Sequence, residues 1–161
     1  MPSEQDQFRK VMRQWASGVC VVTTNYFDVY HGMTVSSFSS VSIEPQLVTI
    51  SLMKNSRTHD FVLDAKIFGI TVLSETQKEI SKIFAGLTPE TENRFDGLET
   101  WTLVTGSPFL KEGLAFLDCR LIDVDDFGTN SLFIGEVVAA KVGNGGKPLL
   151  YFDQQYHLLQ E

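Results

Sequence analysis

The sequence has few of the residues that build disulfide frameworks and metal sites, with two cysteines and three histidines among 161 residues. Cys20 and Cys119 belong to no CxxC pair, and His31, His59 and His157 form no HExxH motif or Cys/His cluster. We therefore expect no disulfide framework and no metal site. The two thiols are expected to pack as small buried apolar groups.

Long apolar runs and basic residues are also scarce. No stretch approaches the roughly 18 apolar residues of a membrane-spanning helix, and the chain opens without a charged-then-apolar leader. These absences favour a cytoplasmic protein in a reducing setting, with no membrane partner. The 13 Lys and Arg residues are outnumbered by 20 Asp and Glu residues, which gives a net charge of −7. Because binding to nucleic acid depends on a surplus of basic residues, nucleic acid is not an expected partner either.

Hydrophobic residues make up 43% of the chain, and its length favours one compact domain over residues 1–161. Apolar runs predict strands at 19–24, 46–52, 66–73, 114–124, 131–140, 148–152 and 156–159. A loop at 25–28 is predicted to lead to a further long strand. Helical spacing and capping residues predict short helices at 8–16, at 56–63 and from 74 onward. Residues 88–101 are polar and turn-rich, which predicts a long surface loop. Many strands and few helices predict a mainly β fold, a closed antiparallel barrel, because closure removes exposed strand edges.

The most unusual segment is 34–42, in which six of the nine residues carry hydroxyl groups. One interpretation is a strand with a solvated hydroxyl face. The other is that hydroxyls and backbone amides line a polar, uncharged ligand, such as a sugar alcohol or the edge of a heterocycle.

Positive charge is unevenly placed beside this segment. No Lys or Arg occurs from Gln14 to Met53. Charged and polar residues then come together as Lys54, Asn55, Ser56, Arg57, Thr58 and His59. At the start of a predicted helix, free N–H groups, two hydroxyls and a guanidinium form a set that suits a phosphate. An ordinary capped helix with solvated bases is the alternative.

Other segments carry weaker signals. The glycine-rich stretch 143–146 lacks the spacing of a phosphate loop and predicts a hairpin turn. No Gly-x-Ser-x-Gly elbow is present, and no Ser-His-acid triad can be picked out from the sequence. Asp123, Asp125 and Asp126 are interpreted as a solvated hairpin end rather than as paired catalytic acids.

Short motifs along nearly the whole chain carry a family resemblance. They lie at 15–24 (WASGVCVVTT), 32–38 (GMTVSSF), 42–45 (SIEP), 56–58, 68–73, 83–86, 107–110, 135–137 and 148–151. In this order and spacing they resemble the short-chain flavin reductases of the FMN-binding split-barrel group, the NAD(P)H-dependent partners of two-component flavin monooxygenases. The resemblance implies a closed split β-barrel of Greek-key type that forms a homodimer, with flavin near the subunit interface.

Positions that match the family's flavin site can be carried over one by one. The ring and the ribityl chain would contact Met33, Thr34, Val35, Ser36 and Ser37. The pyrimidine edge or the ribityl group would contact Ser51 and Leu52. The phosphate would be held by Ser56, Arg57 and Thr58, and the cofactor would be covered by Phe84 and Ala85. The resemblance implies FMN as the cofactor, with FAD as the alternative.

The same resemblance implies a hydride transfer from NADH or NADPH to flavin N5, after which reduced flavin is released to a partner monooxygenase. The cofactors supply the reactivity while the protein orients them and excludes water, so no catalytic acid or base is expected. Tyr156 or Phe152 would form the nicotinamide side of the pocket, and ordinary core packing is the alternative for both.

One turn departs from the family pattern. Many members carry Gly-Asp-His at the hairpin turn that meets the pyridine nucleotide, whereas this chain has Gly128-Thr129-Asn130. Asn130 can donate a hydrogen bond but cannot carry a positive charge. The departure leaves open an FMN-binding electron carrier or sensor that does not oxidise nicotinamide. An oxidase of another substrate on the same barrel, as in pyridoxamine phosphate oxidases, fits the motif order less well.

Overall fold

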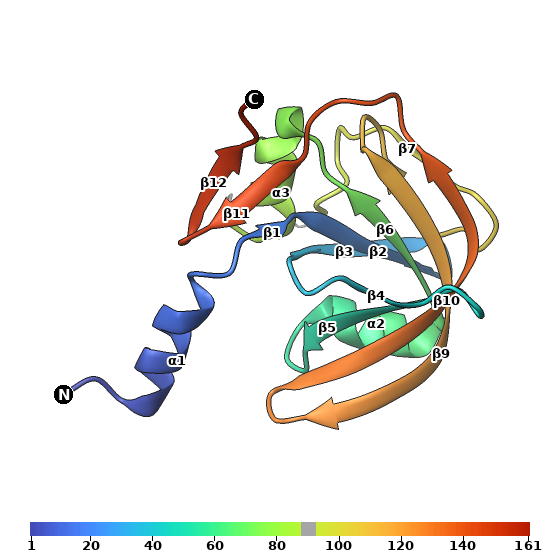
Figure 1. Cartoon of the computed structure of the whole chain (residues 1–161). Coiled ribbons are helices and arrows are strands. Elements are labelled where there is room, and N and C mark those ends of the chain that lie inside the picture. The colour runs from blue at the N-terminus through green and yellow to red at the C-terminus, as the bar shows by residue number, and fades with distance from the viewer. Residues whose placement is uncertain (88–92) are drawn as a thin grey trace.

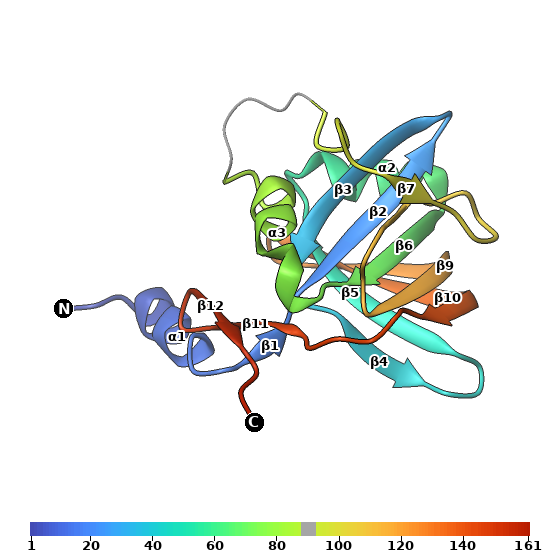
Figure 2. The ribbon, with the colours of Figure 1, turned by 90° about the horizontal axis from the view of Figure 1, so that it is seen from above.

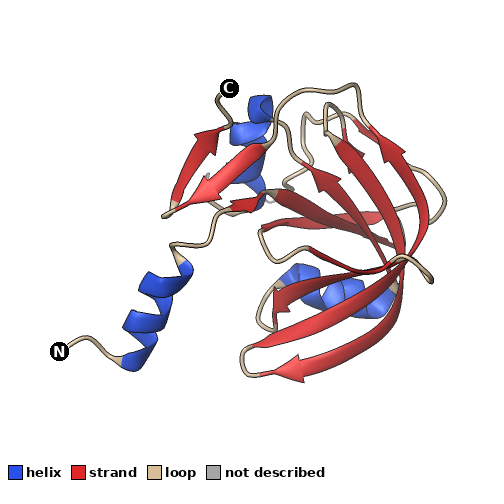
Figure 3. Cartoon of the chain, viewed as in Figure 1, coloured by secondary structure: helices blue, strands red, loops and turns tan. Residues whose placement is uncertain are grey.

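The structure is a computed structural model that describes residues 1–87 and 93–161 (Figure 1). Part of the predicted surface loop, residues 88–92, lies outside the described residues. The region ends in a short strand that was not predicted, β7 (Thr100–Trp101), which pairs with a second unpredicted strand, β8 (Phe109–Leu110). Figure 3 shows strands predominating over a few short helices, so the predicted mainly β fold is confirmed.

Seven strands form the main sheet, in the order β3-β2-β6-β9-β10-β5-β4, and every neighbouring pair is antiparallel. They are β2 (Cys20–Tyr26), β3 (Val29–Val35), β4 (Ser39–Ser42), β5 (Leu47–Met53), β6 (Ile67–Val72), β9 (Ala115–Phe127) and β10 (Asn130–Val142). A second sheet has the order β1-β11-β12. Its strands are β1 (Ser17–Gly18), β11 (Leu149–Phe152) and β12 (Gln155–Leu158).

The predicted closed barrel is not confirmed. The described sheet curls, as Figures 1 and 2 show, but its edge strands β3 and β4 are not paired with each other. They are successive segments of the chain, and the residues between them are Ser36, Ser37 and Phe38. The chain leaves the ladder at these three residues. There the Ser37 hydroxyl accepts from the Ser51 N–H and donates to the Ser51 carbonyl, both at 3.0 Å, in place of backbone pairing.

Strand β2 is buried on both faces, as its continuous β-branched sequence predicts. Cys20 and Val22 belong to an apolar cluster inside the curled sheet. Val19, just before the strand, and Val21 belong to a second cluster outside it, together with residues from α3 and β11. The molecule therefore has two apolar cores that share one strand as their common wall.

Helix α1 (Glu4–Met12) begins and ends about four residues earlier than the predicted helix at 8–16. The reason is a capping box before the predicted start: the Asp6 N–H donates to the Ser3 hydroxyl, and the Ser3 N–H donates to the Asp6 carboxylate. All residues of α1 are exposed, and Figures 1 and 2 show the helix extending away from both sheets.

Helix α2 (Arg57–Ala65) starts where predicted, with Ser56 as its N-cap, and ends at Lys66 in the left-handed conformation. Its Val62 side chain packs in the inner core. The predicted helix from residue 74 is a 3₁₀ turn, η1 (Glu75–Gln77), followed by α3 (Lys78–Phe84). Helix α3 packs against the outer core through Ile80, Ile83 and Phe84, the residues that give it an apolar side.

Both cysteines are free and buried, as predicted. Burial raises the pKa of the Cys20 thiol to about 12. Burial, assisted by the negative charge of Asp118, raises the pKa of Cys119 to about 12 as well. Thiols with such pKa values stay protonated at neutral pH and are poor nucleophiles.

The long β9–β10 hairpin depends on close backbone approach at Gly135. Strand β10 shifts register between Ile134 and Gly135. A Cβ at Gly135 would overlap the Phe68 ring and lie 3.1 Å from the Cβ of Cys119. Both neighbours are fully buried, so neither can move aside.

We therefore predict that Gly135→Ala lowers the free energy of unfolding by about 1–3 kcal/mol through overpacking of the inner core. Urea denaturation followed by circular dichroism measures the change. Gly18→Ala is the matched control, because a Cβ there meets nothing within 4 Å. Equal stability of the two variants would contradict the assigned packing around Phe68.

Candidate functional site

Three of the predicted site residues meet at the break between β3 and β4. The Ser37 hydroxyl holds the backbone of Ser51, and the Asn130 side-chain amide donates to the Ser51 hydroxyl at 3.0 Å. Ser37, Ser51 and Asn130 come from three different strands or loops. The hydroxyl-rich segment is therefore linked through Ser51 to the β9–β10 turn, a link that the sequence does not reveal.

On β3 and β5, the side chains of the other residues predicted to contact flavin mainly make contacts within the protein. Met33, Val35 and Leu52 contribute their side chains to the inner core. The Thr34 hydroxyl donates to the Ser81 carbonyl of α3 at 2.6 Å. Strand β3 is nevertheless an edge strand of the described sheet, so its free edge offers backbone N–H and C=O groups to a ligand.

A cavity of about 620 Å³ lies beside the break. It is lined by Ser36, Ser37 and Phe38 from the break, by Trp15 after α1, and by Tyr151 from β11. Hydroxyls thus lie next to aromatic rings, and the volume is within the range typical of small-molecule pockets. This combination suits a flat heterocycle that carries polar groups.

The first turn of α2 is the second candidate region. The Ser56 hydroxyl donates to the Met53 carbonyl at 2.9 Å and accepts from the His59 N–H, so it already has partners as the N-cap. Thr58 is buried. Arg57, the first residue of the helix, makes no hydrogen bond or ion pair within the described residues. Free N–H groups at such a helix start favour an anion.

Two side chains that sequence reasoning missed, His31 and Arg94, lie near Arg57. Burial, and then the charges of Arg57 and Arg94, lower the pKa of His31. Burial and the charge of Arg57 also lower the pKa of Arg94. The lowered pKa leaves His31 uncharged at neutral pH, whereas Arg57 and Arg94 keep their charges, and the repulsion between these two is unfavourable until an anion binds. Arg94 lies far from Arg57 in the sequence, so no local spacing relates the two residues.

Arg94 also joins β3 to the end of α3. Its guanidinium donates to the Gly32 carbonyl at 2.9 Å and to the Phe84 carbonyl at 2.8 Å. The Phe84 ring is fully buried against Phe95, and Ala85 ends α3 with its N–H bonded to the Ser81 carbonyl. The Phe84 backbone therefore lies beside the Arg94 guanidinium, with Ala85 next to it in the chain. The Phe84 side chain packs in the outer core.

The three residues predicted to bind nucleotide are not brought together within one chain. Gly128 and Asn130 lie at the tip of the β9–β10 hairpin, which belongs to the main sheet. Tyr156 lies on β12 in the other sheet, and its hydroxyl hydrogen-bonds the Ser81 hydroxyl at 2.7 Å. Phe152 is on the neighbouring strand β11. Figure 1 shows the hairpin tip and β12 on opposite sides of the molecule.

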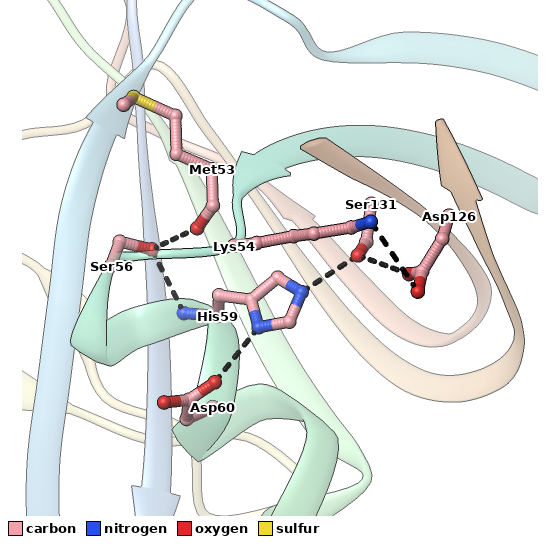
Figure 4. A network of polar contacts seen from close by, with 7 residues as sticks. All are labelled: Met53, Lys54, Ser56, His59, Asp60, Asp126 and Ser131. Atoms are coloured by element: carbon pink, nitrogen blue, oxygen red, sulfur yellow. Dashed lines mark hydrogen bonds and ion pairs between the residues drawn. The ribbon is translucent and has the colours of Figure 1, made fainter. Parts of the chain in front are cut away.

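A polar network joins α2 to this hairpin (Figure 4). His59 Nδ1 lies 3.0 Å from an Asp60 carboxylate oxygen, and His59 Nε2 lies 2.7 Å from the Ser131 hydroxyl. This is the order of a Ser-His-Asp triad. However, Ser131 is 1% exposed and donates its proton to Asp126 at 2.6 Å, so it is neither accessible nor activated. The network is not a hydrolase site.

Metal and membrane features can be judged for residues 1–87 and 93–161. No three His, Cys, Asp or Glu side chains in this part of the chain gather as metal ligands would. No helix there combines the length and the apolar character needed to span a membrane.

Comparison with known proteins gives consistent relatives. An FMN reductase (NADH), RutF 2, of Rhizobium rhizogenes is 32% identical over 159 residues, covering 98% of this chain and 91% of that protein. The reductase component of a Rhodococcus opacus 4-nitrophenol 4-monooxygenase/4-nitrocatechol 2-monooxygenase is 35% identical over 151 residues, covering 94% and 79%. The solved structure of the flavin reductase PheA2 is 32% identical, with a TM-score of 0.91 and coverage of 99% and 100%.

The family model described as flavin reductase like domain matches residues 12–160. This match spans both sheets, the break at 36–38 and the first turn of α2. The resemblance inferred from the short motifs is confirmed. With this match and relatives above 30% identity over nearly its whole length, the chain belongs to the flavin reductase like domain family.

Proposed function

We propose that this protein binds FMN, reduces it with NADH or NADPH and supplies reduced flavin to a partner monooxygenase. The single observation that carries the proposal is the pair of like charges, Arg57 and Arg94, at the start of α2, with the neutral imidazole of His31 beside them. A group of like charges next to free helix N–H groups is suited to a phosphate. The names of the relatives, an FMN reductase that uses NADH and a reductase component of a monooxygenase, support the same reaction.

The residues present fit a flavin mononucleotide. Arg57 and Arg94, with the N–H groups of α2, would hold the phosphate. Ser36, Ser37 and the free edge of β3 would bond the ribityl chain and the ring edge. When bound, FMN supplies the acceptor for the hydride of the nicotinamide. The protein's part is to orient the two ring systems and to exclude water, which requires no acid or base.

The hairpin tip at Gly128 and Asn130 is proposed to meet the nicotinamide nucleotide. Gly128 has a positive φ of 60°, which lets the chain turn sharply there. The Asn130 side-chain amide already donates a hydrogen bond to the Ser51 hydroxyl, so it connects the tip to the hydroxyl groups of the proposed flavin site. The same engagement favours the second candidate function, an FMN-binding electron carrier, because it leaves Asn130 less free to bind nucleotide.

A second copy of the chain is the proposed partner of α1. Phe8, Val11, Met12 and Trp15 are 65%, 59%, 49% and 72% exposed, and they share one face of the helix and its continuation. Exposed apolar residues that line the cavity at the break, among them Phe8 and Trp15, are suited to burial between two protomers. A homodimer would then cover the flavin pocket.

Two buried free thiols and no disulfide are consistent with the cytoplasm as the proposed compartment.

We predict that Arg57→Ala weakens FMN binding about tenfold and riboflavin binding by less than about twofold, because riboflavin lacks the phosphate. Isothermal titration with the two ligands measures both effects. Arg120→Ala, which removes an exposed guanidinium from β9, is the control and should change neither. Equal losses of affinity for FMN and riboflavin would show that Arg57 does not bind the phosphate.

Anaerobic mixing of the FMN-loaded protein with NADH or NADPH separates the reductase from the carrier. The reductase proposal predicts bleaching of the flavin absorbance faster than in a protein-free mixture. The same experiment with FAD tests the choice of flavin. If bleaching is no faster than in the protein-free control with either nucleotide, the reductase proposal is wrong and the electron carrier is the remaining function.

The dimer proposal predicts that the double variant Phe8→Glu/Val11→Glu sediments as a monomer, because two carboxylates would be buried at the interface. Analytical ultracentrifugation measures the mass. Lys10→Glu, on the opposite face of α1, should leave the mass of a dimer unchanged. A monomeric wild-type protein would refute the proposal.

A further inference from the structure

In the network between α2 and the β9–β10 hairpin, the available donors and acceptors determine the direction of the hydrogen bond between His59 and Ser131. Ser131 has one hydroxyl proton, and it is directed at Asp126. That hydrogen bond, followed by the charges of Lys54 and His59, lowers the pKa of Asp126, so the carboxylate is ionised and can only accept. The Ser131 oxygen must therefore accept its second hydrogen bond from His59 Nε2–H.

The other ring nitrogen faces a carboxylate. His59 Nδ1 lies 3.0 Å from Asp60 Oδ1. The imidazole thus lies between the carboxylate of Asp60 and the chain of contacts that runs through Ser131 to Asp126. Figure 4 shows this line of contacts, with Lys54 at its far end.

This line connects two regions with proposed ligands. His59 lies in the first turn of α2, two residues after Arg57, and its N–H is bonded to the Ser56 cap. Ser131 follows Asn130 at the hairpin tip. His59 is 6% exposed and Ser131 1%, so their hydrogen bond is shielded from water, whereas the Lys54–Asp126 ion pair is exposed. The buried bond is the stronger constraint on the tip.

We propose that His59 is a positioning residue whose buried hydrogen bond to Ser131 holds the tip of the β9–β10 hairpin against α2 so that nicotinamide nucleotide meets an ordered turn. This inference rests on the proposed function, which assigns the tip to the nucleotide. A second contact assists it, because the Lys54 N–H donates to the Thr129 carbonyl at 3.0 Å. No contact of His59 with flavin or nucleotide is required.

The first test is Ser131→Ala, which breaks the line at its centre. It should raise the KM for NADH about tenfold while kcat and the FMN dissociation constant change by less than about twofold. In flavin-free protein, hydrogen exchange of the amides at 127–130 should accelerate about tenfold. Similar losses in KM, kcat and FMN binding would show a general structural role and overturn the proposal.

A pair of charge variants provides the matched control. Asp126→Asn weakens the acceptor for Ser131 and should accelerate exchange at 127–130. Asp125→Asn makes the same change of charge on the neighbouring exposed residue of β9 and should not. Equal acceleration in both variants would overturn the proposal, because it would trace the effect to charge at the hairpin rather than to the network.

The wild-type protein supplies a measurement that requires no variant. Proton–nitrogen NMR should show hydrogen on Nε2 of His59, the nitrogen that donates to Ser131. An Nε2 that carries no hydrogen would refute the assigned hydrogen bond and with it the proposal. This measurement and the exchange experiment need no turnover, so failure of wild-type protein to oxidise NADH would refute the proposed function and remain distinguishable from failure of the His59 network.

Discussion

The burial of β2 on both faces is the constraint on which the rest of the structure depends. One strand supplies side chains to an inner and an outer apolar core, so the sheet must curl around one cluster while α3 and the second sheet cover the other. Helices α2 and α3 and the small sheet then pack against the main sheet. Polar ligands can be held only where this double burial ends, at strand ends and edges.

The two candidate regions arise at such places. At residues 36–38 the chain passes from one edge of the sheet to the other, and side-chain hydroxyls take over the hydrogen bonds that a ladder would make. At the start of α2 the helix leaves its first N–H groups free, and β3 and the segment after residue 92 bring His31 and Arg94 beside them. Both regions thus combine unpaired backbone with polar side chains held by a packed core.

Features whose causes are local could be predicted from the sequence. The doubly buried β2, the Ser56 cap and the hairpin turn at 128–129 each leave a pattern within about ten residues, and each was confirmed. The start of α1 was wrong by four residues because the Ser3 capping box precedes its apolar face. Arg94, His31 and the His59–Ser131 bond were missed, since they join segments far apart in the chain. The closed barrel is not confirmed, because pairing between β3 and β4 depends on the path of the chain through residues 36–38, which local patterns do not determine.

The distribution of charge explains how an acidic protein can hold an anionic ligand. Acidic residues outnumber basic ones, and a long-range field from a charge of −7 repels phosphate. That field is screened by salt within roughly 10 Å, whereas Arg57 and Arg94 act at contact distance and Arg94 is partly desolvated. Their mutual repulsion costs stability in the ligand-free protein, and a bound phosphate would relieve it.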